Sequence, residues 1–453
     1  MTISQSLAEF ILSVDPEKMP VQAVNAAKTH FIDGMSCMFF GVNSASVKLA
    51  LKYDRASGAA GDCLFPNRDG YKTSAESCAM LCAMAAHSND FDDMSISLNG
   101  HPSALLVPVV YAAAQKYKCT GAEMLAAYIA GVETDAILGK IFADGGHYKG
   151  WNTTCLIGIF GAVAAAGRIM KLDRGQLANA LGIAANEASG VKANYGTLSK
   201  DLAIGSAARK AMMAAECARL GMDSSADAFE GEFGLLSSLG GVDAEKAKEI
   251  IGSHESDFVS PGLVMKPYPS CRGNHSGIEA ATELSAQFGI GTDDVDRVVC
   301  YVDQAAHDTD RYEHPKTPEQ AKFSLAFCIG KVMTGGRVTM HDFIGEEIAD
   351  KAALAFVDKV KIECRPELFT ESRFGTEVRI ELKDGRTLSR KVCFPKGDPQ
   401  NPMSTAEIQQ KLRGCLEAAL GTYRANAAVE VLERFDTLAD IEDLIVVLKK
   451  DRR

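Results

Sequence analysis

The sequence is short of the features that mark partners of nucleic acids and membranes. No run of lysine and arginine occurs before residue 449, and 48 basic against 59 acidic side chains give a formal net charge of −11. Because nucleic acids and anionic membranes attract basic patches, we expect neither as a partner. The longest uncharged apolar stretch, residues 150–167, contains Asn152 and two threonines and is rich in glycine and alanine. It therefore predicts a buried helix rather than a membrane span.

The cysteines also lack an arrangement typical of disulfide frameworks or metal sites. There are 13 of them, and no two form a CxxC motif. The opening segment MTISQSLAEF is amphipathic and lacks the basic-then-apolar order of a secretory leader. We therefore expect a cytoplasmic protein whose thiols are reduced and mostly fill the core.

Helix formers at helical spacing dominate the sequence up to about Ser253, for example Leu7, Phe10 and Ile11. Between residues 162 and 215 alanine recurs so often that neighbouring helices are expected to approach one another closely. The first part of the chain is therefore predicted to be a tightly packed helical domain.

From about Pro261 the pattern changes to that of strands. Residues 297–302, 359–364 and 377–382 alternate or run through β-branched side chains. The dipeptide Asp384-Gly385 then predicts a hairpin closed by a type I′ turn. Two helices are expected among the strands, near His275 and over residues 321–334, which makes this part an α+β unit.

The last part of the chain returns to helix, because Ser404 and Glu407 form the pattern of a capping box. The predicted fold class is mainly α: a large all-helical domain with a smaller α+β lid domain inserted before the C-terminal helices. The predicted boundaries are 1–262, 263–402 and 403–453, with hinges at Gly262 and Gly397. Ligand is expected to bind at the seam between the two domains.

The densest polar cluster is HSNDFDD, residues 87–93, followed by His101 at the start of an apolar helix. Asp90 and Asp93 are three residues apart, so on a helical turn they would share a face and one pKa would rise. A histidine titrates near neutral pH and suits proton transfer. The alternative interpretation is a solvated helix end followed by a capping histidine.

This cluster also contains residue types that bind divalent cations. Its spacing fits neither an EF-hand loop nor an HExxH motif, so we expect no metal. The residues concerned are His87, Asp90, Asp92, Asp93 and His101.

Two further clusters carry cations. Lys200 lies in GTLSKD, which lacks P-loop spacing, and such a lysine can hold a carboxylate or act as a base. The segment KPYPSCRGNH presents Lys266, Arg272 and His275 on a backbone restricted by two prolines, which suits recognition of a polycarboxylate. Cys271 has no evident base partner and is not expected to be a nucleophile. The alternatives are a surface lysine and a rigid interdomain linker.

Together these clusters resemble the MmgE/PrpD family over essentially the whole chain. The resemblance is carried by residues 86–114, 150–190, 196–221, 266–275 and 321–336. It implies a helical domain with a smaller lid, a homodimer, and cofactor-free chemistry next to a carboxylate of small di- and tricarboxylates. It also implies that Asp90, His101, Lys200 and His275 line the active site.

The chain departs from the family pattern at three positions. Asn152 stands where many members have a histidine, Ala203 replaces another, and Phe327 stands where decarboxylase-like members often have a tyrosine. These departures remove acid/base groups, and Tyr148 is a candidate for the missing hydroxyl.

The leading hypothesis is a cofactor-independent lyase, either dehydratase or decarboxylase, acting on a small polycarboxylate. Lys200 is the expected base or enediolate stabiliser, His101 the acid and Asp90 the residue that orients it, with His275 as a second acid/base group. The residues expected to bind substrate are Lys266, Arg272, Asn152, Ser199 and Tyr268. No cofactor is expected.

Two other hypotheses stay open. An epimerase of a substituted succinate such as iminodisuccinate would use Lys200 and Tyr148 as its proton-transfer pair. An inactive member of the family would bind polycarboxylates without turning them over.

Overall fold

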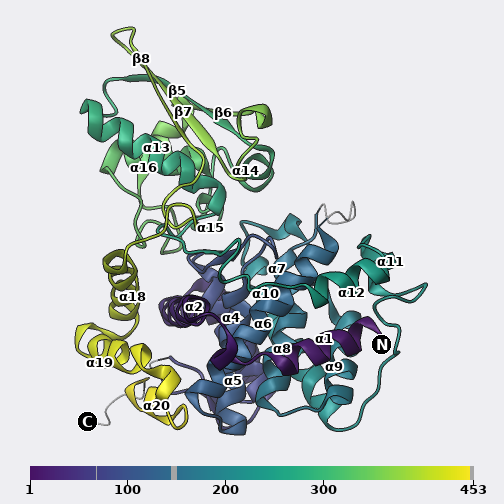
Figure 1. Ribbon diagram of the computed structural model, residues 1–453. Helices are drawn as coiled ribbons and strands as arrows, with labels where there is room; N and C mark the ends of the chain where they lie inside the picture. The colour runs from purple at the N-terminus through teal and green to yellow at the C-terminus, as the bar shows by residue number, and fades with distance from the viewer. Residues whose placement is uncertain (68, 144–149, 449–453) are drawn as a thin grey trace.

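Helices contain most of the described residues up to Gly252 in the computed structural model, which describes residues 1–67, 69–143 and 150–448 (Figure 1). The helices are α1 (Ile3–Ser13), α2 (Val21–Gly41), α3 (Ala45–Ser57), α4 (Ala75–Ser88), α5 (Pro102–Tyr117), α6 (Gly121–Phe142), α7 (Thr153–Leu156), α8 (Gly158–Ile169), α9 (Arg174–Glu187), α10 (Leu198–Arg219), α11 (Leu235–Leu239) and α12 (Ala244–Gly252). Short strands β1 (Cys63–Leu64) and β2 (Lys72–Thr73) pair with each other.

Small residues allow the helices of this body to approach closely, as expected from the recurring alanines. A Cβ atom at Gly205 of α10 would lie 2.6 Å from Cγ of Met84 and 2.8 Å from the carbonyl oxygen of Met80, both on α4. Only glycine therefore permits this crossing. The crossing matters for the site, because α4 ends just before Asp90 and α10 begins just before Lys200.

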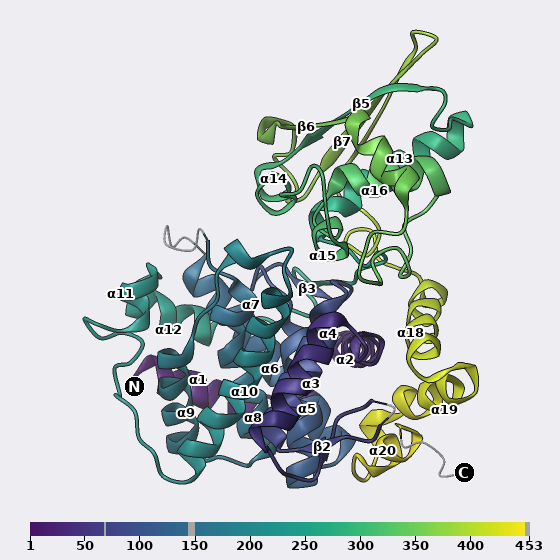
Figure 2. The same cartoon turned by 180° about the vertical axis from the view of Figure 1, so that it is seen from behind.

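The second unit is an α+β lid, seen above the helical body in Figures 1 and 2. Its mixed sheet has the strand order β6-β5-β7-β8, with β5 and β6 parallel and the other pairs antiparallel. Helices α13 and α16 pack on each other, and the apolar core of the lid forms between them and the sheet. The elements are α13 (Arg272–Phe288), β5 (Val295–Val302), α14 (Gln304–Thr309), α15 (Pro318–Ala321), α16 (Leu325–Gly335), α17 (Lys351–Phe356), β6 (Val360–Cys364), β7 (Thr376–Leu382) and β8 (Thr387–Val392).

The chain then returns to the helical body through α18 (Thr405–Leu420), α19 (Thr422–Glu433) and α20 (Glu442–Leu448). Leu412 and Leu416 of α18 join the large core, and Ser404 and Glu407 form the expected capping box. Figure 2 shows these helices beside the body, with α18 next to α2. The fold is thus mainly α with a smaller α+β region, as predicted.

Short helical turns and one further strand pair complete the connections. The strand pair is β3 (Met94–Ser95) with β4 (Leu263–Val264), and it joins the polar loop after α4 to the segment that enters the lid. The turns are η1 (Pro16–Lys18), η3 (Lys192–Asn194), η4 (Val357–Lys359), η5 (Pro366–Leu368) and η6 (Phe435–Thr437).

Two local predictions were wrong in detail. The β7–β8 hairpin forms, but its turn bond runs from the Gly385 N–H to the Leu382 carbonyl, and only Gly385 has a positive φ, of 87°. A type I′ turn needs two such residues, so the turn is of another type. The helix expected over residues 321–334 is interrupted after Ala321 and restarts at Leu325, where Ser324 caps it.

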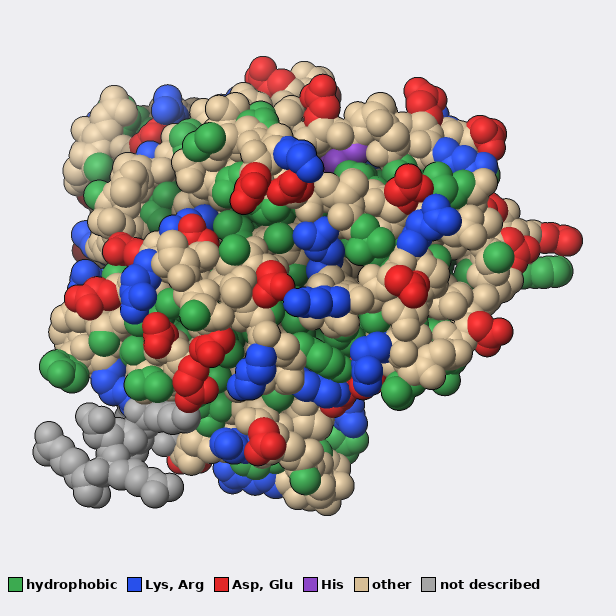
Figure 3. All heavy atoms as spheres, turned by 60° about the horizontal axis from the view of Figure 1, so that its bottom comes forward, with side chains coloured by type: hydrophobic (Ala, Val, Ile, Leu, Met, Phe, Trp, Pro, Cys, Tyr) green, Lys and Arg blue, Asp and Glu red, His purple; other side chains and the backbone are tan. Residues whose placement is uncertain are grey.

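The charged residues do not gather by sign on the face that Figure 3 draws, where acidic and basic side chains are interspersed. Within the described ranges no helix combines the length and apolar character needed to cross a bilayer. All 13 cysteines are free thiols, and most of them are buried.

Candidate active site

A small cavity of about 50 Å3 lies where the lid meets the helical body. Four residues singled out from the sequence line it: Asp90, His101, Lys200 and Arg272. The other lining residues come from both units and are Met94, Asn99, Gly100, Lys192, Tyr195, Cys271, Thr309, Phe323 and Phe374. The cavity lies at the seam, where ligand is predicted to bind.

The carboxylate of Asp90 forms ion pairs with two lysines. Its Oδ1 accepts a hydrogen bond of 2.8 Å from Lys200 Nζ, and its Oδ2 lies 3.2 Å from Lys266 Nζ. Lys266 Nζ also donates to the Asp90 carbonyl at 3.0 Å. Asp90 has a left-handed φ of 52°, which an aspartate tolerates better than most residues. The Lys266 bonds to both its backbone and its side chain hold this conformation.

The charges of this cluster are strongly coupled. Burial alone would raise the pKa of Asp90, but the Lys200 and Lys266 ammonium groups hold that pKa well below its usual range. Burial alone would lower the pKa of Lys200, but the carboxylates of Asp90 and Asp201 raise it. At neutral pH Lys200 is therefore an ammonium ion, which suits stabilisation of negative charge better than removal of a proton.

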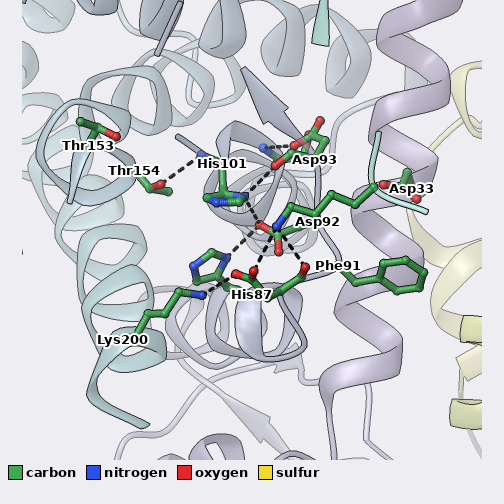
Figure 4. Close-up of polar contacts among 12 residues, drawn as sticks. Asp33, His87, Phe91, Asp92, Asp93, His101, Thr153, Thr154 and Lys200 are labelled. Carbon is green, nitrogen blue, oxygen red and sulfur yellow. Dashed lines mark hydrogen bonds and ion pairs between the residues drawn. The ribbon is translucent and has the colours of Figure 1, made fainter. Parts of the chain in front are cut away.

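His101 is oriented by Asp92 and by the backbone. Its Nδ1 lies 2.8 Å from the Asp93 carbonyl oxygen and 3.2 Å from Asp92 Oδ2. A carbonyl only accepts, so Nδ1 carries a hydrogen and Nε2 is the atom left for proton transfer. Figure 4 shows His101 between Thr154 and the two aspartates. The prediction that Asp90 orients His101 was wrong, because the turn after α4 directs Asp90 to the lysines instead.

His87 approaches Asp92 beside His101. Its Nδ1 is 2.9 Å from the same Asp92 Oδ2, and the two imidazole rings are 4.9 Å apart. Burial alone would raise the pKa of Asp92, but the two histidines hold it well below its usual range. Burial lowers the pKa of His87. Asp92 is thus a buried carboxylate shared by two imidazoles.

The loop before His101 is fixed by the short helix α7. Thr154 Oγ1 accepts a 3.0 Å hydrogen bond from the His101 N–H, and the Thr153 hydroxyl donates to the Asn99 carbonyl. A Cβ at Gly100 would lie 2.9 Å from Thr154 Oγ1, so the glycine permits this contact. His101 is therefore placed by backbone contacts as well as by Asp92.

Asp93 belongs to a separate buried network. Its carboxylate contacts His30 Nδ1 at 2.9 Å and accepts from the Ser103 hydroxyl at 2.6 Å. The expectation that Asp90 and Asp93 share a helical face was wrong, since Asp90 has left-handed rather than helical backbone angles. The two carboxylates have different partners.

The two cations of the KPYPSCRGNH segment, Arg272 and Lys266, have different partners and different positions relative to the cavity. Arg272 lines the cavity; one of its terminal nitrogens donates to Asp398 Oδ2 at 2.9 Å, and Nη1 has no hydrogen-bond partner among the described residues. That nitrogen is itself buried, so a carboxylate can reach it only when the lid opens. Lys266 was expected to bind substrate, but it is completely buried and its ammonium contacts Asp90. Lys266 therefore positions Asp90 and does not line the cavity.

His275 lies next to the cavity rather than among its lining residues. Its Nε2 donates to the Ser270 carbonyl at 3.1 Å, and its buried Nδ1 has no partner among the described residues. Burial, together with the charges of Arg272 and Lys266, holds the pKa of His275 well below its usual range. His275 is therefore neutral, and Tyr268 packs on its ring at 5.3 Å.

Several predicted residues are not brought to the cavity. Ser199 faces a larger groove of about 1040 Å3 between α3, α4 and α10. Asn152 is buried at the start of α7 and does not line the cavity, and Tyr268 is half-buried beside His275. Tyr148 lies outside the described residues. Phe327 packs against Phe343 in the lid core, 5.9 Å between ring centres.

One group of described residues has the composition of a metal site: His87, Asp92 and His101, whose candidate ligand atoms lie within 4.8 Å of one another. In this structure Asp92 Oδ2 contacts Nδ1 of both imidazoles and His101 Nδ1 donates to a carbonyl, while Asp92 Oδ1 has no hydrogen-bond partner among the described residues. These hydrogen bonds fit a proton relay in which Asp92 orients both rings.

Two family models together match most of the chain. The model of the MmgE/PrpD N-terminal domain matches residues 5–246, and that of the MmgE/PrpD C-terminal domain matches residues 268–437. The chain belongs to the MmgE/PrpD family. Its relatives include cis-aconitate decarboxylase of Homo sapiens, 22% identical over 459 residues that cover 99% of this chain and 95% of that protein. Cis-aconitate decarboxylase of Aspergillus terreus is 21% identical over 473 residues, covering 98% and 96%.

This MmgE/PrpD chain also brings residues to the cavity that sequence reasoning missed. Phe323 lies 5.2 Å from Lys200 Nζ, ring centre to nitrogen, and stacks near Tyr195 at 5.5 Å. Lys192 also lines the cavity. The only sequence signal was that Lys192 and Tyr195 precede the lysine loop, and nothing in their spacing distinguished them from surface residues.

Proposed function

We propose that this MmgE/PrpD protein is a cofactor-independent lyase that acts on a small di- or tricarboxylate by proton transfer next to a carboxylate. The observation that carries the proposal is the joint placement of Lys200, His101 and Arg272 in one cavity. A cation for negative charge, an imidazole for a proton and a guanidinium for a carboxylate are the groups that such chemistry needs.

Arg272 supplies the carboxylate-binding step. Its Nη1 is buried without a partner among the described residues, and a buried donor left unpaired costs free energy. A substrate carboxylate would satisfy it with a charge-assisted hydrogen bond. Asp398 holds the other side of the guanidinium in place at 2.9 Å.

Lys200 and His101 supply the chemical step. In the dehydratase form, Nε2 of His101 removes a proton from the carbon next to a carboxylate, and Lys200 stabilises the resulting enediolate. Hydroxide then leaves as water with the proton that His101 has taken up. In the decarboxylase form, carbon dioxide leaves with Lys200 stabilising the negative charge, and protonated His101 returns a proton to carbon. Asp92 keeps Nδ1 of His101 protonated in both forms.

Lid movement is part of the proposal. The cavity has room for roughly three to five water molecules, less than a tricarboxylate occupies. The lid residues Arg272 and Phe323 close it against Lys200, so substrate would enter by opening at Gly262 and Gly397, both at positive φ. Closure would then exclude water from the intermediate.

The positions of the three departures from the family pattern support an active enzyme over an inactive binding protein. Asn152, Ala203 and Phe327 are all absent from the cavity wall, so their side chains do not change its chemistry directly. An epimerase of a substituted succinate is the second candidate. For it, the Tyr195 hydroxyl offers a proton donor in the cavity, since burial raises the pKa of that phenol.

We further propose a cytoplasmic homodimer whose interface includes the groove between α3, α4 and α10. Leu49, Tyr53 and Leu202 line it and are exposed, and its rim mixes Arg209 with Glu187. An apolar patch with charges of both signs suits a second copy of the same surface. Sedimentation of the wild type and of Leu202→Glu tests this, since the variant should be monomeric.

The proposed reaction is tested by incubating wild type and Lys200→Met with citrate, 2-methylcitrate, cis-aconitate and substituted succinates, and following products by NMR. A new alkene or a lost carboxylate, abolished in the variant, supports a lyase. Epimerised acid supports the second candidate. Binding without turnover by wild type would support the inactive alternative.

A further inference from the structure

Lys192 is a cation of the cavity wall that has no ion-pair partner among the described residues. It lies in η3, just after the end of α9, and lines the cavity together with Lys200 and Arg272. Lys200 contacts Asp90 at 2.8 Å and Arg272 contacts Asp398 at 2.9 Å. Within the described ranges, the Lys192 ammonium makes no hydrogen bond or ion pair. It is therefore available to an anion in the cavity.

The backbone of Lys192 is held by both units of the protein. Its N–H donates to the Gly150 carbonyl of the helical body at 2.8 Å, and its carbonyl accepts from Arg311 of the lid at 3.0 Å. Three residues on, the Tyr195 carbonyl accepts from the Tyr312 hydroxyl of the lid at 2.7 Å. A Cβ at Gly196 would lie 2.4 Å from the Tyr312 ring, so this contact is close. The segment that carries Lys192 is thus fixed when the lid is closed.

The surroundings of Lys192 are electropositive. Burial, with a further contribution from the Arg373 guanidinium of the lid, lowers the pKa of Lys192, while Asp308 opposes this. Two cations from different units that repel each other would both be stabilised by an anion between them. Asp90 is the carboxylate among the described side chains of the cavity wall, and it contacts Lys200 and Lys266 rather than Lys192.

We propose that Lys192 binds a second carboxylate of the substrate and thereby sets the preference of the enzyme for acids with more than one carboxylate. Arg272 takes one carboxylate through its free Nη1, and Lys192 takes another on the wall formed by the helical body. Because Arg311 and Tyr312 contact the Lys192 segment only from the lid, binding of the second carboxylate also favours the closed state. This inference rests on the proposed function, since it names a specificity residue of the same cavity.

The test measures ligand affinity rather than turnover, so it does not depend on the reaction type. Isothermal titration calorimetry compares propane-1,2,3-tricarboxylate with glutarate, which keeps two of its carboxylates, and with butyrate, which keeps one. The proteins are wild type, Lys192→Met, Lys192→Arg and the control Lys316→Met, which removes an exposed lysine away from the cavity. Thermal unfolding of each variant checks that the fold is kept.

Loss of one charge-assisted contact predicts that Lys192→Met weakens binding of the triacid by roughly 10- to 100-fold. Binding of butyrate should be weakened by less than about twofold, because its single carboxylate is held by Arg272 and none is left for Lys192. Lys192→Arg should keep most of the affinity, and Lys316→Met all of it.

Two results would overturn the inference. If Lys192→Met binds all three acids as wild type does, or loses the same factor for each, Lys192 does not hold a particular carboxylate, while the proposed function stands. If wild type binds none of the three acids, the proposed function fails and the inference fails with it.

Discussion

Lys200 Nζ and Asp90 Oδ1 lie 2.8 Å apart at the seam between the helical body and the lid, and both side chains are almost completely buried. Lys200 comes from the first turn of α10, and Asp90 from the turn after α4. The close crossing of these two helices therefore determines the geometry of the ion pair. Because Asp90 keeps Lys200 protonated, a cation lines the cavity before any substrate arrives.

Replacing that cation should remove most of the activity. Lys200→Met is expected to lower kcat by roughly 10²- to 10³-fold, the usual loss when one stabilising group for a developing anion is removed. Lys200→Arg should retain more activity because it keeps the charge. Steady-state kinetics with whichever acid is turned over measure this, with Lys316→Met as the control for losing a lysine. A kcat within twofold of wild type in Lys200→Met would contradict the assignment.

Asp92 should act on the rate through His101. In Asp92→Asn the imidazole loses the carboxylate that orients it, so kcat should fall by roughly 10²-fold or more. KM should change by less than about threefold, because Asp92 does not line the cavity. A purely structural role for Asp92 would lower the amount of folded enzyme and leave kcat per folded molecule unchanged.

The pH dependence of stability should report on Asp90. The pKa of an aspartate in the unfolded chain is about 3.9, and that of Asp90 in the folded protein is well below it. Such a group contributes stability that is fully present above the unfolded pKa and is lost as the pH falls through the folded pKa. In Asp90→Asn this contribution is absent, so the free energy of unfolding should fall less between about pH 4 and pH 2 than in wild type.

At neutral pH the same variant should be less stable, by about 3–5 kcal/mol, because Lys200 and Lys266 lose a buried partner. Urea unfolding at a series of pH values measures both effects. Parallel pH curves for the two proteins would mean that Asp90 titrates no differently in the folded and unfolded states.

Phe327→Tyr should not restore a catalytic phenol. Phe327 is fully buried against Phe343 in the lid core, so the added hydroxyl would lack a partner and should destabilise the protein by about 1–3 kcal/mol. Differential scanning calorimetry and product analysis give the two readouts. A gain of activity at unchanged stability would show that residue 327 reaches the cavity.

Much of this arrangement follows from local patterns. Asp90, His101, Lys200 and Arg272 were identified by residue type in polar clusters and all reach the cavity. The strands and the Ser404 cap also follow from short-range signals, since alternation and capping act over a few residues.

The partners of these residues could not be predicted in the same way. Asp90 rather than Asp92 was expected to orient His101, because spacing gives no sign of the left-handed φ of Asp90. Phe323 rather than Phe327 contacts Lys200, since the helix is interrupted between Ala321 and Leu325 and Phe323 leaves the helical register. Both features depend on contacts between segments far apart in the sequence.

The central claim is that, without a metal ion, His101 transfers a proton at carbon in a polycarboxylate while Lys200 stabilises the negative charge. The most direct measurement incubates metal-stripped wild type and His101→Asn with cis-aconitate and 2-methylcitrate in deuterated water, and locates deuterium in products and recovered acids by NMR and mass spectrometry. The account predicts deuterium at one carbon next to a carboxylate with wild type, and its loss by roughly 10²-fold or more in the variant. Exchange that is unaffected in His101→Asn, or that appears only after a divalent cation is added, would contradict it.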